Sequence, residues 1–175
     1  MAPGWFCTGR ELTQVASAAA LFDIVRVKSY RTFLILPAIL ALTAATCSAQ
    51  ASWQTDYQKA QEEAKSKNKL LFINFTGSDW CGYCIRMDRD ILSKPQFKDF
   101  ASKNLVLLEV DFPRAKEQPT PLRLQNRKLA GEYNVEGFPT YVVLNGDGKK
   151  VWEWGGYFPD GPDAFIAELQ KLRKG

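Results

Sequence analysis

A short, almost wholly apolar segment constrains this chain more than any other feature. Residues 70–75 read LLFINF, without the alternation of polar and apolar side chains that marks a strand with one face in solvent. Such a strand is buried on both faces, in the middle of a sheet that helices cover from both sides. The segment therefore predicts an α/β fold.

The other elements follow from apolar periodicity and from the positions of glycine and proline. The predicted order is α-β-α-β-α-β-β-α, in which helical crossovers make the early strands parallel and a tight turn at 145–148 adds an antiparallel strand. We expect one domain with a mixed sheet of four to five strands, flanked by helices on both faces. The expected helices lie near 53–66, 85–101 with a break at Pro95, 121–133 and 160–172, and the expected strands at 70–75, 105–112, 140–144 and 150–154.

The first part of the chain has the pattern of an export signal. Two basic residues, Lys28 and Arg31, precede an apolar run at 33–45, and small residues follow with an A-x-A cleavage pattern at 49–51. The apolar run is shorter than the ~20 residues that a membrane-spanning helix needs. This order of basic, apolar and small residues indicates a signal peptide.

Residues 28–51 are accordingly interpreted as a secretory signal peptide, and residues 52–175 as the mature domain, periplasmic or secreted. Residues 1–27 form an N-terminal extension, which is unusual ahead of a signal peptide, and our hypothesis is that the true start lies near Val27. Two alternatives stay open: an uncleaved signal that anchors the protein in the membrane, and a lipid attached to Cys47 after cleavage.

Cys81 and Cys84 carry the most specific chemical signal. They follow a buried strand and a short loop, at the predicted start of a helix, where free N–H groups and the helix dipole favour a thiolate over a thiol. Their spacing lets the two sulfurs form a disulfide. We expect Cys81 to be the exposed nucleophile and Cys84, further into the helix, to resolve the mixed disulfide.

The remaining composition disfavours other chemistry. The chain has no histidine, which leaves no Cys-His pair and no imidazole metal ligand. Its other cysteines, Cys7 and Cys47, precede the mature domain, so a four-ligand zinc site on one chain is not expected. The net charge of +4 comes without a basic block and argues against nucleic acid. We expect neither a metal nor an organic cofactor.

At these residues the chain resembles the thioredoxin superfamily. The segment WCGYC at 80–84 is similar to the family's WCxxC active site, and GFPT at 137–140 is similar to its cis-proline loop, with the expected elements between them. Segments 75–81 and 110–113 resemble exported bacterial thioredoxin-like proteins related to the C-terminal domain of the membrane thiol:disulfide interchange reductase. The resemblance covers about 69–173 and implies a thioredoxin fold for the mature domain.

The resemblance also implies roles for residues around the two cysteines. It implies a cis peptide bond between Phe138 and Pro139 that faces the cysteines, with backbone groups of Phe138 free to pair with an extended substrate segment. Trp80 and Phe138 would form apolar walls of the docking groove. Gly82 and Tyr83, between the cysteines, would belong to the same substrate-binding surface.

Two positions depart from the family pattern. Thioredoxins usually carry a buried Asp or Glu where this chain has Asn74, and a buried Lys where it has Leu107. The proton relay that assists Cys84 is therefore missing or altered, and we expect a slow second exchange step. Asp79 is nearer to the cysteines in sequence but is expected to be exposed. We treat Asn74 and Asp79 as candidate modulating residues.

The function predicted from these residues is that of a thiol:disulfide oxidoreductase acting on protein substrates, as a monomer that receives electrons from a membrane partner. Tyr83 adds no positive charge beside the nucleophile, which favours the reducing direction. The alternatives are an oxidant or isomerase, a non-catalytic binding module of the same fold, and a copper-delivery protein, which the lack of histidine disfavours.

Overall fold

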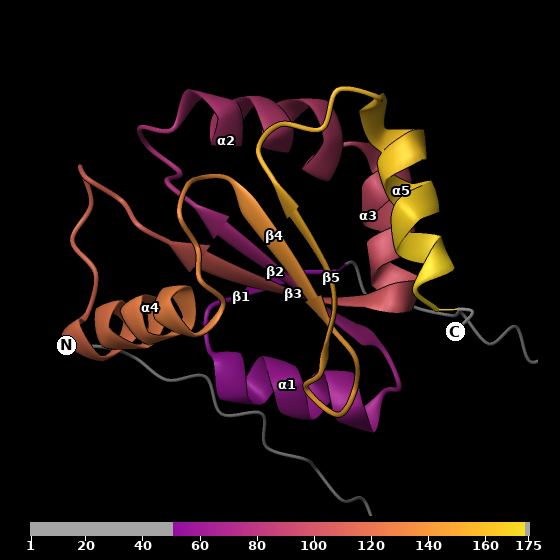
Figure 1. The fold of residues 1–175 in the computed structure, drawn as a ribbon, viewed down its shortest axis with the longest axis horizontal. Helices are drawn as coiled ribbons and strands as arrows, with labels where there is room; N and C mark the ends of the chain where they lie inside the picture. The colour runs from indigo at the N-terminus through magenta and orange to yellow at the C-terminus, as the bar shows by residue number, and fades with distance from the viewer. Residues whose placement is uncertain (1–50, 174–175) are drawn as a thin grey trace, which may run out of the picture. The chain divides into compact units, whose positions relative to one another are not determined.

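A computed structural model describes residues 51–173, which form a five-stranded sheet with helices on both faces (Figure 1). The strand order is β1-β3-β2-β4-β5, in which β3 is parallel to both β1 and β2, while β4 is antiparallel to both β2 and β5. The predicted α/β class and mixed sheet are confirmed. The strands are β1 (Trp53–Gln54), β2 (Leu70–Thr76), β3 (Leu105–Asp111), β4 (Thr140–Leu144) and β5 (Lys150–Gly155).

Helices cover both faces of the sheet, as the buried run at 70–75 predicts. One apolar cluster joins the sheet to α2, η1, α3 and α5, and a second cluster on the opposite face joins it to α1 and α4. The helical segments are α1 (Tyr57–Ser66), α2 (Gly82–Met87), the π-helical turn η1 (Asp88–Leu92), α3 (Pro95–Asn104), α4 (Thr120–Glu132) and α5 (Gly161–Lys171).

Phe72 shows how tightly the first cluster is packed. Its side chain is fully buried, and its ring centroid lies 5.5 Å from that of Tyr141, 5.8 Å from that of Phe97 and 6.0 Å from that of Phe165. All seven residues of β2 are buried. The strand is thus fixed on both faces, and it ends just before the loop that leads to the two cysteines.

The helix expected near 53–66 begins later than predicted. Trp53 and Gln54 instead pair with β3 as a short parallel edge strand, and the Trp53 ring packs against Phe72 with 6.1 Å between centroids. The helix starts at Tyr57, because the Asp56 carboxylate caps it by accepting a hydrogen bond from the Lys59 N–H at 3.1 Å. Trp53, which the helical spacing of apolar residues assigned to this helix, therefore belongs to the sheet.

The sequence also predicts a helix at 85–92 and a turn at 145–148. The segment predicted as one helix over 85–92 consists of α2 followed by the wider turn η1. The turn at 145–148 is confirmed: Asn145 Oδ1 accepts hydrogen bonds from the N–H groups of Asp147 and Lys149, and Gly148 adopts a φ of 82° that suits glycine.

The predictions for the N-terminal part fall outside the described residues, apart from residue 51. They are the extension at 1–27, the signal peptide at 28–51 and the alternative lipid site at Cys47. In the part of the chain that the structure describes, no helix has the length and apolar character needed to cross a bilayer.

Candidate functional site

The two cysteines lie where the loop after β2 enters α2. Cys81 is the N-cap residue of α2, and its sulfur accepts a hydrogen bond from the Cys84 N–H at 3.2 Å. The two residues are joined by a disulfide, with their Cα atoms 5.2 Å apart. A backbone N–H donated to the Cys81 sulfur at a helix start stabilises negative charge on that sulfur.

The expected difference in exposure between the cysteines is not present in the disulfide form. Cys81 is 7% exposed and Cys84 is 5% exposed. Both cysteine residues are therefore buried while the disulfide is formed. The dipeptide between them is open instead: Gly82 is exposed, and Tyr83 is 64% exposed.

Trp80 is clamped beside the cysteines. Its Nε1 donates a hydrogen bond to the Phe112 carbonyl at 2.8 Å, and the Arg114 guanidinium carbon lies 3.7 Å from the centroid of its ring. Phe138 meets the Trp80 ring edge to face at 5.9 Å, which brings two predicted site residues together. Gly77 lies against the indole, where a Cβ would come within 2.5 Å of it.

Asp79 has a structural partner rather than a free carboxylate. It accepts hydrogen bonds from the Arg114 N–H at 3.0 Å and from the Ala115 N–H at 2.7 Å. These backbone donors hold the pKa of Asp79 below its ordinary value. The carboxylate therefore anchors the loop after β3, and it remains charged at neutral pH.

The loop before β4 forms the other wall of the site. The Phe138–Pro139 peptide bond is cis, as expected, and the Pro139 carbonyl accepts a hydrogen bond from the Gly156 N–H at 2.7 Å. A hollow of about 510 Å³ lies along this loop, and Glu136 and Glu153 are among the residues that line it. In Figure 1 the loop lies beside the start of α2, in agreement with the contact between Trp80 and Phe138.

Glu109 is a site residue that sequence reasoning missed. It lines a cavity of about 240 Å³ together with Asn74 and Cys84, and it is paired with Asn74 in the register between β2 and β3. Burial raises the pKa of Glu109, and the charges of Asp111 and Asp88 raise it further. The available signal was a single acidic residue inside the apolar run of β3.

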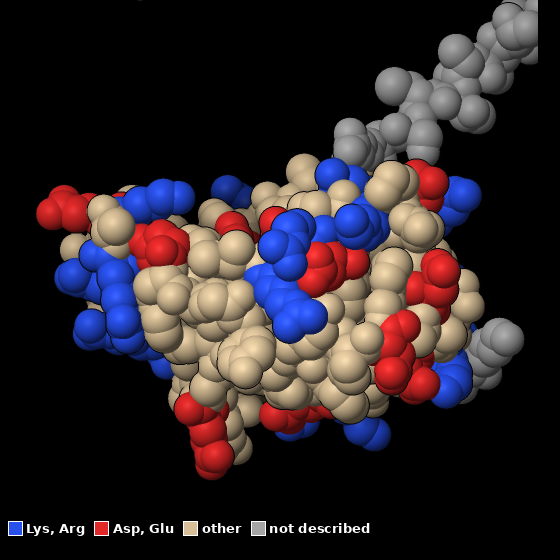
Figure 2. All heavy atoms as spheres, turned by 90° about the horizontal axis from the view of Figure 1, so that it is seen from above, with Lys and Arg blue, Asp and Glu red and all other residues tan. Residues whose placement is uncertain are grey.

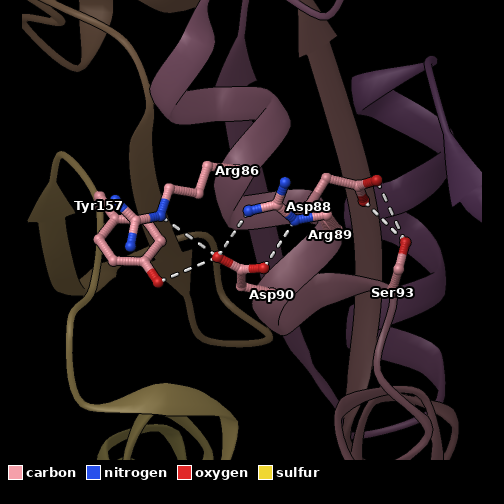
Figure 3. A network of polar contacts seen from close by, with 6 residues as sticks. All are labelled: Arg86, Asp88, Arg89, Asp90, Ser93 and Tyr157. Atoms are coloured by element: carbon pink, nitrogen blue, oxygen red, sulfur yellow. Dashed lines mark hydrogen bonds and ion pairs between the residues drawn. The ribbon is translucent and has the colours of Figure 1, made fainter.

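A polar network fixes the turn that follows α2 (Figure 3). Asp90 accepts hydrogen bonds from Arg89 Nε at 2.8 Å, Arg86 Nε at 3.3 Å and the Tyr157 hydroxyl at 3.2 Å. The Arg89 contact is the main reason that the pKa of Asp90 falls to about 2. The Arg86 guanidinium also lies 4.3 Å from the centroid of the Tyr157 ring. Arg86 of α2 and Arg89 of η1 are thus both paired with the Asp90 carboxylate.

The surface above the site carries both signs of charge. Figure 2 shows the side of the molecule on which α2 lies in Figure 1, with basic and acidic side chains interspersed around an uncharged area. No continuous basic field is visible on this face, which agrees with the low net charge of the sequence.

The chain is similar in sequence to known thioredoxin-like proteins. The sequence matches the family described as the thioredoxin-like domain over residues 57–173. It is 36% identical over 135 residues to the disulfide bond reductase DsbH of Chlamydia pneumoniae, covering 77% of this chain and 80% of DsbH.

Two solved structures show the same fold. A structure of a DsbH oxidoreductase superposes with a TM-score of 0.67 at 36% identity, covering 77% of this chain and 92% of the other. The oxidised C-terminal domain of DsbD from Neisseria meningitidis superposes with a TM-score of 0.50 at 21% identity, covering 66% of this chain and 91% of that domain. The expected thioredoxin fold is confirmed.

Proposed function

Because this chain belongs to the thioredoxin-like family of thiol:disulfide oxidoreductases, we propose that it reduces disulfides in protein substrates through Cys81 and Cys84. The observation that carries the proposal is the position of Cys81 at the start of α2, where its sulfur accepts the Cys84 N–H. A thiolate stabilised in this way attacks disulfides at neutral pH.

The two cysteines have different roles. The Cys81 thiolate attacks one sulfur of the substrate disulfide, forms a mixed disulfide with it and releases the other substrate sulfur as a thiolate. The Cys84 sulfur then attacks Cys81, which releases the reduced substrate and leaves the Cys81–Cys84 disulfide. The hydrogen bond to the Cys81 sulfur supports this order, because it favours the thiolate at Cys81.

The substrate is an extended protein segment that lies across the loop before β4. Within residues 51–173, neither the N–H nor the carbonyl of Phe138 takes part in a hydrogen bond, so both are available for strand-like pairing. Trp80 and Phe138 supply apolar contacts, and the exposed Gly82 and Tyr83 complete the surface. Glu136 in the adjoining hollow favours segments that carry basic side chains, whereas Glu153 is already paired with Lys150 at 2.6 Å.

The reducing direction is supported by the charges around the pair. Tyr83 places no positive charge between the cysteines, and Arg86 is engaged by Asp90. A thiolate with little extra stabilisation makes the disulfide a weak oxidant. The name of the relative DsbH, disulfide bond reductase, describes the same direction.

The proposed location is outside the cytoplasm, in the periplasm or secreted, after removal of residues 28–51. Residues 52–175 would form the mature domain. Continued reduction in such a compartment requires an electron donor, for which a membrane protein is the proposed partner.

Trapping of the mixed disulfide tests the assignment of roles. Insulin serves as the disulfide substrate, and the reduced chain is compared with its Cys84→Ala and Cys81→Ala variants. We expect Cys84→Ala to accumulate a covalent adduct with insulin through Cys81, and Cys81→Ala to form none while losing insulin reduction. Reduction of insulin by Cys81→Ala at the rate of the wild type would contradict the proposal.

A further inference from the structure

Two polar side chains interrupt the apolar face of the sheet beneath α2. Phe72 and Leu107 belong to the apolar cluster that α2 covers, and Asn74 and Glu109 follow them by two residues on β2 and β3. Because side chains alternate between the faces of a sheet, Asn74 and Glu109 lie on this same face. They are also paired in register, so their side chains are neighbours across the two strands.

The cavity that these residues line with Cys84 is suited to polar contents. Its volume of about 240 Å³ is several times the ~30 Å³ that one water molecule takes up in the liquid. Asn74 is 8% exposed, and its Oδ1 has no hydrogen-bond partner among the described residues. A buried acceptor of this kind is costly unless a donor reaches it, and water or a protonated carboxyl in the cavity would supply one.

Glu109 is the carboxylate in this cavity that is placed to change its protonation state. It is half-buried, and no hydrogen bond from another described residue holds its charged form. Burial and the charges of Asp111 and Asp88 raise its pKa, and Lys116 opposes them. It therefore takes up a proton more readily than an exposed glutamate does.

The neighbouring carboxylates are engaged elsewhere. Asp88 also borders the cavity, but it is exposed, and both of its oxygens accept from the Ser93 hydroxyl at 3.1 and 3.2 Å (Figure 3). Asp111 accepts from the N–H of Ser78 at 2.9 Å and from its hydroxyl at 2.7 Å. The oxygens of both side chains are thus occupied by the Ser93 and Ser78 donors, and Glu109 has no such partner among the described residues.

We propose that Glu109 accepts the proton of the Cys84 thiol through water in this cavity. The buried carboxylate that assists the second exchange step then lies on β3, whereas thioredoxins usually carry it at the position of Asn74 on β2. This inference rests on the proposed function, since it concerns the step in which Cys84 resolves the mixed disulfide. Asn74 has a positioning role, because its amide oxygen accepts a hydrogen bond from the same water or from the protonated carboxyl.

The step balances without another reactant. The Cys84 thiol gives its proton to Glu109, and the resulting thiolate attacks the Cys81 sulfur. The bond between Cys81 and the substrate sulfur breaks, and the substrate sulfur leaves with the electron pair. The chain is oxidised to the Cys81–Cys84 disulfide while the substrate is reduced by two electrons, and the proton on Glu109 passes to the substrate thiolate or to solvent.

The test separates the two exchange steps with the chromogenic aryl disulfide 5,5′-dithiobis(2-nitrobenzoate). Reduced chain releases one coloured thiolate when Cys81 attacks and a second when Cys84 resolves the adduct, and stopped-flow absorbance records both phases from pH 5 to 9. The variant is Glu109→Gln, and the matched control is Glu132→Gln, which removes an exposed carboxylate on α4. A missing first phase in the wild type would contradict the proposed function and not this inference.

In the wild type we expect the rate of the second phase to stay nearly constant from pH 8 down to the pKa of Glu109. In Glu109→Gln the second phase should be at least ~10-fold slower at pH 6 and should rise about tenfold per pH unit toward the ordinary thiol pKa of about 8.5, with the first phase unchanged. Two results overturn the assignment: a second phase slowed equally at every pH, or one equal to the wild type.

A variant that fails to fold does not leave the question open, because the wild type alone is informative. A wild-type second phase that rises about tenfold per pH unit throughout pH 5–8 shows an unassisted thiol and overturns the proposal. The double variant Asn74→Asp/Glu109→Gln returns a carboxylate to the paired strand position, and we expect it to regain most of the rate at pH 6. Loss of rate through packing alone would not be regained in this way.

Discussion

Gly77 leaves no space for a side chain beside Trp80. An ideal Cβ at this position lies 2.5 Å from Cε2 and 2.6 Å from Nε1 of the indole. The ring cannot yield freely, because its Nε1 donates to the Phe112 carbonyl and its face contacts Arg114. Overpacking costs about 1–3 kcal/mol, and loss of the hydrogen bond costs about 1 kcal/mol. Gly77→Ala should therefore lower the free energy of unfolding by about 2–4 kcal/mol.

Urea unfolding followed by tryptophan fluorescence measures this difference. The matched control is Gly131→Ala in α4, where a Cβ meets no atom within 4 Å. The control should raise the free energy of unfolding by about 0.4–1 kcal/mol, because alanine restricts the unfolded chain and favours the helix. A Gly77→Ala variant within about 0.5 kcal/mol of the wild type would refute the argument that Trp80 is rigidly held.

Three further changes should alter stability. Phe72→Ala should lower the free energy of unfolding by about 3–5 kcal/mol in urea, because a fully buried ring leaves a cavity; a loss under 1 kcal/mol would contradict this. Because the pKa of Asp79 is lower in the folded than in the unfolded protein, its carboxylate stabilises the fold above the ordinary pKa of 3.8. This contribution is lost as the pH falls through the folded-state pKa. Asp79→Asn should therefore weaken the fall in the free energy of unfolding at acidic pH. The raised pKa of Glu109 means that the folded state binds more protons than the unfolded state between pH 4.5 and the folded-state pKa. The free energy of unfolding of the wild type should therefore fall as the pH rises through this range. Glu109→Gln should abolish that fall and should be more stable than the wild type at pH 7. A plot of unfolding free energy against pH that runs parallel to that of the wild type would argue against a buried carboxyl.

The features that could be predicted from the sequence are those with local signals. The buried strand β2 follows from an apolar run, and the disulfide between Cys81 and Cys84 follows from a spacing that one helical turn can close. The cis bond before Pro139 was expected from the resemblance of its motif. Each of these needs only a few neighbouring residues.

The features that were missed depend on pairing between distant segments. Trp53 has helical spacing to Tyr57, but its partner is Leu107 of β3, and edge pairing overrides the helical pattern. Glu109 gains its place beside Cys84 only because β2 and β3 align it with Asn74. A strand register between segments more than 30 residues apart cannot be derived from either segment alone.

The reduction potential of the Cys81–Cys84 pair tests the central claim most directly. The full chain is equilibrated in glutathione and dithiothreitol buffers of known potential. Free thiols are then alkylated, and the oxidised fraction is measured by mass spectrometry. We predict a value below about −220 mV, nearer to the ~−270 mV of thioredoxin than to strong oxidants. A value above about −150 mV would contradict the proposal and would mark the protein as an oxidant of its substrates.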